Sequence, residues 1–71
     1  MIALLTHIAR DEKGNMSFLK SARDLTFVGG LVENSDRETE LFSLDGGYIC
    51  TVAEAFDTVY KLYLLSREAM V

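Results

Sequence analysis

The sequence lacks the residues that usually brace so small a protein. Its 71 residues include one cysteine, one histidine, no tryptophan and no proline. A single cysteine excludes an intrachain disulfide. With only one histidine in addition, the chain has too few of the usual ligands for a zinc site of its own. A domain of this length buries only about 60% of the surface that its unfolded chain exposes, so its stability is marginal. Association with other chains is the remaining way for such a domain to gain stability, and we expect a homo-oligomer, most simply a dimer.

Positive charge and long apolar runs are also scarce. Seven lysines and arginines stand against eleven acidic residues, for a formal net charge of −4. This balance argues against general affinity for a phosphate backbone. No apolar run approaches the length of a membrane span, and we expect no secretory signal. A cytoplasmic protein of bacterial or phage origin is the default expectation.

The strongest local pattern lies in residues 39–50. The dipeptide Asp45-Gly46 separates two apolar segments and predicts a hairpin with a two-residue primed turn. In that register Leu41 faces Cys50, and opposed residues share a face. The register therefore predicts a buried face made of Phe42, Leu44 and Ile49.

A helix is predicted directly after this hairpin. Thr51 and Glu54 fit a capping box at its start, and the helix should run to Arg67. Six apolar residues then recur at the three-four spacing of one helical face: Val52, Ala55, Phe56, Val59, Leu62 and Tyr63. Three more lie beside this stripe and widen it beyond one packed face: Tyr60, Leu64 and Leu65. We predict that these three form a protein interface; the alternative is that they complete a monomer's core.

The first half of the chain reads as sheet. Residues 2–9 predict a strand, 10–15 a polar turn and 16–19 the returning strand. The path of residues 20–33 is ambiguous, because Ser21 could cap a helical turn before a strand at 25–32 that bends at its paired glycines. The fold class is α+β: a single domain, 1–71, with an antiparallel sheet of about four strands and one C-terminal amphipathic helix packed on it.

Few residues suggest chemistry. Cys50 lies beside the predicted helix N-terminus, a setting that lowers a thiol pKa, and His7 is a candidate base for a thiol-dependent enzyme. A buried apolar cysteine and a half-buried histidine are the alternative readings, and we favour them. Four carboxylates lack the spacing of a calcium loop and predict a solvated turn: Glu33, Asp36, Glu38 and Glu40. We predict no catalytic residue, cofactor or metal site.

The one cationic grouping surrounds the first turn. Arg10, Lys13, Lys20 and Arg23 would converge on a hairpin into a basic edge able to meet nucleic acid. Acidic residues interleave with them, so an ordinary mixed surface is the interpretation that we favour. Nucleic acid is accordingly the less favoured partner.

The layout resembles that of the FlbD-type small flagellar proteins of bacteria. The shared features are Met1-Ile2 with Leu5-Thr6, Gly14-Asn15 before Phe18, Thr39 and Leu41 before Asp45-Gly46, the strand end from Tyr48 to Val52, and Glu54 with the helix through Leu62. The chain is longer around Gly29 to Glu38 than the family pattern and lacks its basic tail. LytTR-like DNA-binding domains end in a similar strand, turn and helix. The resemblance implies a non-enzymatic role in motility or its regulation.

Three hypotheses for function follow. The leading one is a non-enzymatic protein-interaction or regulatory module that self-associates through the flank of its C-terminal helix. The second is a nucleic-acid-binding transcriptional regulator that uses the basic residues near the first turn. The third is a thiol-dependent enzyme built on Cys50 and His7, which requires the two side chains within hydrogen-bond reach. A phage-encoded inhibitor of a host protein is compatible with the first hypothesis.

Overall fold

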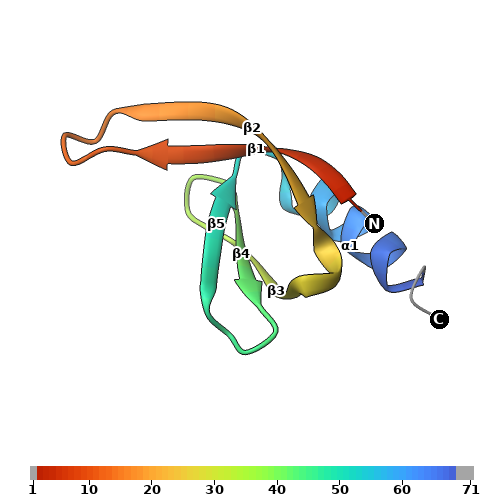
Figure 1. Cartoon of the computed structure of the whole chain (residues 1–71). Coiled ribbons are helices and arrows are strands. Elements are labelled where there is room, and N and C mark those ends of the chain that lie inside the picture. Colours follow the sequence, from red (N-terminus) through yellow and green to blue (C-terminus); the bar gives the residue numbers. More distant parts are fainter. Residues whose placement is uncertain (1, 69–71) are drawn as a thin grey trace.

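The fold is α+β, with a five-stranded antiparallel sheet followed by one C-terminal helix (Figure 1). The computed structural model describes residues 2–68. Its elements in chain order are β1 (Ile2–Arg10), β2 (Met16–Asp24), the 3-10 helix η1 (Leu25–Phe27), β3 (Val28–Glu33), β4 (Thr39–Ser43), β5 (Tyr48–Val52) and α1 (Phe56–Glu68). The strand order is β2-β1-β5-β4-β3. The predicted class is confirmed, with one strand more than expected.

Strands β1 and β2 form a long, regular hairpin. Their register runs without a break from the Ile2–Asp24 pair to the Arg10–Met16 pair. The turn is organised by Asp11, whose Oδ1 accepts hydrogen bonds from the amides of Lys13 and Asn15, each at 2.9 Å. Because β2 continues to Asp24, Ser21 does not cap a helical turn; its hydroxyl donates to the Leu5 carbonyl across the hairpin. The strand predicted at 25–32 begins only at Val28, since residues 25–27 form η1, capped by the Asp24 carboxylate, which accepts from the Thr26 amide.

The hairpin joins the rest of the sheet over a short distance. One residue pair, His7 with Val52, links β1 to β5, and the Ala53 amide adds a hydrogen bond to the Thr6 carbonyl at 2.8 Å. Beyond this join the hairpin projects past the β3-β4-β5 sheet, toward the left of Figure 1. We call residues 10–20 the arm; every one of them is exposed.

The β4–β5 turn differs from the predicted one. Gly46 has φ +91°, whereas Asp45 is not among the residues with positive φ, so the turn is not of the primed two-residue type. The Ser43 amide donates to the Gly47 carbonyl, which leaves a three-residue loop, and a register shift follows between Leu41 and Phe42.

The buried face of this hairpin is not the predicted one. The predicted Leu41–Cys50 pair is confirmed, but Phe42 lies opposite Tyr48. Leu41 and Cys50 are buried while Leu44 is 64% exposed, so the predicted buried face was wrong. The core cluster contains Ala3, Leu5, Leu25, Val28, Leu41, Cys50, Val52 and Val59.

The helix begins later than the capping box predicts. Thr51 and Val52 belong to β5, where they pair with β4, and α1 starts at Phe56. The Glu54 carboxylate does not reach back to Thr51; it accepts hydrogen bonds from the Thr6 amide at 2.8 Å and the Thr6 hydroxyl at 2.9 Å. Strand pairing satisfies the backbone of Thr51 before a helix can form there, and Glu54 fastens the connection to β1.

Helix α1 packs on η1 and β3 through the buried side chain of Val59. Near its C-terminal end the Arg67 guanidinium donates to the Val28 carbonyl at 2.6 Å and lies 4.9 Å from the centre of the Tyr63 ring. The Arg67 hydrogen bond holds the C-terminal end of the helix against the start of β3. Together with the packing of Val59, it also fixes which side of the helix faces solvent.

Candidate interaction surfaces

The exposed side of α1 carries the three residues predicted as an interface. Tyr60 is 44% exposed, Leu64 42% and Leu65 52%. At 3.6 residues per turn, Tyr60 and Leu64 lie on one flank and Leu65 on the other, with exposed Lys61 between them. We call Tyr60, Leu64 and Leu65 the helix surface. Its two apolar flanks are separated by the charged side chain of Lys61.

A hollow of about 210 Å³ borders the Tyr60 flank. It lies between α1 and β3 and is lined by Gly29, Gly30, Leu31, Phe56, Tyr60 and Tyr63. The rings of Phe56 and Tyr60 stack with their centres 5.9 Å apart. Neighbouring glycines supply no side chains to fill the space, so the helix surface continues into a concave, aromatic-lined region.

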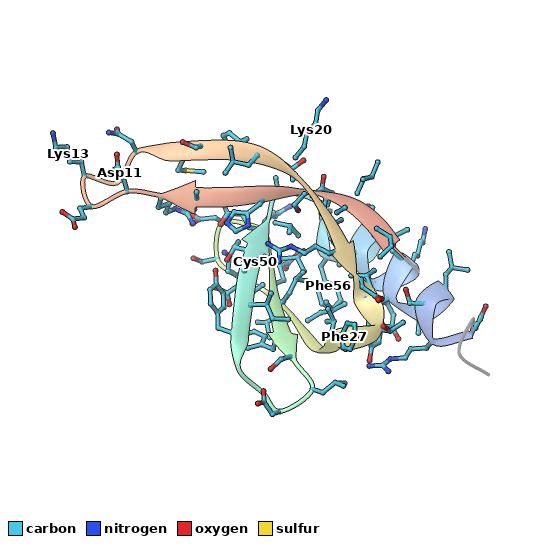
Figure 2. All side chains as sticks on the ribbon, viewed as in Figure 1. Asp11, Lys13, Lys20, Phe27, Cys50 and Phe56 are labelled. Atoms are coloured by element: carbon cyan, nitrogen blue, oxygen red, sulfur yellow. The ribbon has the colours of Figure 1, made fainter. Side chains whose placement is uncertain are left out.

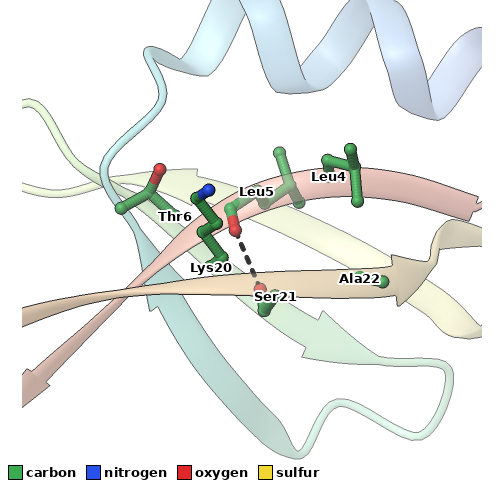
Figure 3. A pocket seen from close by; sticks show the side chains of 6 residues that line it. All are labelled: Leu4, Leu5, Thr6, Lys20, Ser21 and Ala22. Atoms are coloured by element: carbon green, nitrogen blue, oxygen red, sulfur yellow. Dashed lines mark hydrogen bonds between the residues drawn. The ribbon is translucent and has the colours of Figure 1, made fainter.

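The arm is a second apolar surface. Phe18 is 60% exposed, Leu19 53% and Met16 43%. Because side chains alternate along a strand, Phe18 and Leu19 point to opposite faces of the hairpin, and both faces are therefore uncovered here. Near the base of the arm an open depression of about 460 Å³ is lined by Leu4, Leu5, Thr6, Lys20, Ser21 and Ala22 (Figure 3).

The four basic residues do not form one surface. The Arg10 guanidinium binds both carboxylate oxygens of Glu38, at 2.9 and 3.0 Å. Arg23 turns toward the core side of the hairpin, where its Nη2 lies 3.0 Å from His7 Nδ1. Lys13 at the tip of the arm and Lys20 on β2 point outward at separate places (Figure 2). The geometry therefore supplies two separated exposed lysines and no basic edge.

The arrangement around Cys50 does not favour thiol chemistry. Cys50 is 2% exposed, and this burial raises the pKa of its thiol, with an opposing contribution from the Arg23 charge. A guanidinium only donates hydrogen bonds, so its contact makes His7 Nδ1 an acceptor that is already engaged. A protonated, buried thiol is a weak nucleophile.

The turn predicted to be solvated is exposed at Glu33 and Asp36, but the prediction is wrong for Glu38, which orders the turn from a buried position. Glu38 is buried and accepts hydrogen bonds from Asn34 Nδ2 at 2.9 Å and from Arg10. Among residues 2–68, no group of three or more histidine, cysteine or acidic side chains is arranged to hold a metal ion. No helix in the same range is long and apolar enough to cross a membrane.

Comparison of the chain with protein-family models, with characterised proteins and with solved structures finds no match.

Proposed function

We propose that the chain is a small non-enzymatic interaction module that self-associates through the helix surface of Tyr60, Leu64 and Leu65. The supporting observation is the amount of apolar surface that the fold leaves uncovered. In the described part of the chain, large apolar side chains that are at least 42% exposed number twelve: Ile2, Leu4, Met16, Phe18, Leu19, Phe27, Val32, Leu44, Tyr48, Tyr60, Leu64 and Leu65. A soluble domain of this size gains by covering such a surface with a partner.

The helix surface alone supports only a weak contact. With roughly half of each side chain available, three residues offer on the order of 250 Å² per copy, against about 800 Å² per partner in a standard interface. The adjoining hollow at Gly29 and Gly30 adds concave surface for an apolar side chain of the second copy. We therefore expect association that depends strongly on protein concentration.

Solution mass across a broad range of protein concentration tests this proposal. Leu64→Glu places a charge on the helix surface and should lower the average mass at every concentration, because a carboxylate is costly to bury without a partner. Leu44→Glu is the matched control, since Leu44 is also exposed but lies in the β4–β5 turn. A wild type that stays monomeric at every concentration would refute self-association through α1. An equal fall in average mass for Leu64→Glu and Leu44→Glu would refute it as well.

The resemblance to FlbD-type flagellar proteins agrees with a non-enzymatic role and stays a prediction. Nucleic-acid binding is less supported, because Arg10 and Arg23 already have partners within the fold. A shift in the electrophoretic mobility of a nucleic acid on addition of the protein at low salt would support this function. The neighbouring genes would separate a regulator of motility from a phage-encoded inhibitor of a host protein.

A further inference from the structure

The outer edge of β2 carries backbone groups without a strand partner in the described sheet. β2 stands at the end of the strand order and pairs with β1 alone. On the other side of β1, the Thr6 carbonyl accepts from the Ala53 amide, so even-numbered residues of β1 direct their backbone groups toward β5. Their partners on β2 must direct theirs outward. Within residues 16–22 this outward set is Met16, Phe18, Lys20 and Ala22.

This edge lacks most devices that keep edge strands from pairing. The nine-residue register of β2 contains no bulge, and the strand has no proline. Phe18 and Leu19 expose apolar surface on opposite faces. Within residues 16–22 Lys20 is the one charged residue, and it points away from the body of the molecule (Figure 2).

We propose that a second copy of the chain pairs with this edge, β2 against β2 and antiparallel, about a two-fold axis at Leu19. Leu19 then faces Leu19 of the second copy in a non-hydrogen-bonded pair. The other opposed residues are also compatible: Phe18 with Lys20, Met16 with Ala22, and Ser17 with Ser21. The two hairpins become one continuous sheet joined by about eight backbone hydrogen bonds, because each hydrogen-bonded pair exchanges two.

Charge and length favour this register over the two adjacent ones. An axis at Lys20 would oppose two lysines, which is the arrangement by which an edge lysine prevents pairing. An axis at Phe18 would extend the overlap to Gly14, which lies in the turn with φ +84° and cannot continue the ladder. With the axis at Leu19, the pairing spans residues 16–22 without opposing like charges. The Lys20 ammonium also comes near the ring of Phe18 of the other copy.

The edge pairing uses no residue of α1 and so goes beyond the proposed function. The two contacts, one through the β2 edge and one through the helix surface, are each isologous and join two copies. A chain with both surfaces forms assemblies larger than a dimer. Loss of either surface stops assembly at the dimer, and loss of both gives the monomer.

A proline at position 20 tests the β2 edge pairing separately from the helix surface. The Lys20 amide points outward, so Lys20→Pro removes an intermolecular donor and no bond of the β1–β2 ladder. Lys20→Ala is the matched control, because it removes the charge and keeps the donor. We expect Lys20→Pro to be dimeric, Lys20→Pro with Leu64→Glu to be monomeric, and Lys20→Ala to match the wild type. Equal masses for Lys20→Pro and Lys20→Ala would overturn the proposal.

Cross-linking tests the register and the occupant. Opposed Cα atoms in a non-hydrogen-bonded pair lie about 4.5 Å apart, within disulfide range, so L19C should form a covalent dimer on mild oxidation. S17C is the matched control, because its two copies would lie about 13 Å apart along the strands. Both variants retain the buried Cys50.

The L19C cross-link should persist in the Leu64→Glu background, since it requires no contact by α1. If the helix surface does not self-associate, the L19C cross-link still forms. If β2 does not pair with β2, the cross-link is lost while association through the helix surface remains. Equal cross-linking by S17C, or none by L19C, would overturn the proposal; the latter is also expected if the edge receives an extended segment of a different protein.

Discussion

Replacing Glu38 by glutamine removes the charge from a carboxylate that joins two separate parts of the fold. Glu38 is 8% exposed and lies at the start of the β4 region. Its Oε1 accepts from Asn34 Nδ2 at 2.9 Å, and its two oxygens accept from Arg10 at the base of the arm. Asn34 in turn accepts from the Glu38 amide at 2.9 Å, which closes the loop between β3 and β4.

The expected cost follows from these bonds. A hydrogen bond to a charged group contributes about 1.5–3 kcal/mol and a neutral one about 0.5–1.5 kcal/mol, so loss of the charge should cost on the order of 1 kcal/mol at neutral pH after allowance for the partly exposed Arg10. In a domain of this size 1 kcal/mol corresponds to a fall in Tm of roughly 4–8 °C. Urea and thermal unfolding, followed by circular dichroism, measure both quantities.

The pH dependence separates charge from packing. The hydrogen bond from Asn34, followed by the hydrogen bond and charge of Arg10, lowers the pKa of Glu38 despite the opposing effect of desolvation. A lowered folded-state pKa contributes stability above the unfolded value of 4.5, and this contribution is lost as the pH falls through the folded value. The difference in unfolding free energy between wild type and Glu38→Gln should therefore vanish in acid. A difference that is the same at neutral and acidic pH would refute the reasoning.

Two further substitutions test packing by urea unfolding. Gly29→Ala should destabilise by about 2 kcal/mol, because its Cβ would lie 2.7 Å from the Cα of Leu44, whereas Gly30→Ala, with Phe42 Cβ nearest at 3.7 Å, should change stability little. Equal stability of the two variants would contradict the close approach at Gly29. Ser66→Ala should stabilise by about 1 kcal/mol, since the Ser66 hydroxyl is fully buried and lacks a hydrogen-bond partner among residues 2–68. A less stable Ser66→Ala would show that the hydroxyl is satisfied.

Local periodicity was sufficient to predict the class of fold and the helix. The three-four spacing around Val59 and the strand-turn-strand pattern at residues 39–50 depend on neighbours in sequence, and both are present. The helix start was wrong because the residue preference of Thr51 for a cap competes with its pairing to Glu40 on β4. That competition involves residues brought together only by the tertiary fold.

The turn at Asp45-Gly46 illustrates a second limit. Both the primed two-residue turn and the three-residue loop with a bulge place a glycine at positive φ, so the same dipeptide fits either. The choice changes the pairing only beside the turn, where Phe42 lies opposite Tyr48; beyond the bulge Leu41 still pairs with Cys50. Which face is buried depends instead on the tertiary packing, since Leu41 and Cys50 belong to one core cluster with Val28 and Val59. Gly29 lies against the backbone of this turn, a contact that no local pattern in the sequence reveals.

The candidate surfaces were predicted unequally. The position of Tyr60, Leu64 and Leu65 beside the packed stripe follows from helical geometry, and all three are exposed. The sequence left open whether the basic residues form one edge or an ordinary mixed surface, because their faces depend on the hairpin register, which sends Arg23 toward His7 and Lys20 outward. The edge of β2 was missed because only its first four residues were predicted as strand.

The arm gives a geometric reason for association. Strands of nine residues span about 30 Å, whereas the five- and six-residue strands beside them span less than about 20 Å, so the hairpin must outrun its sheet. Helix α1 packs on η1 and β3 and does not cover the excess. An isolated two-stranded ribbon is marginally stable in water, yet this one exposes Phe18 and Leu19. Pairing of two arms places four strands side by side and covers the exposed edge of each. Because the arm extends past the sheet of its own chain, no other strand in the described part of that chain covers it, and its edge is available to a second copy.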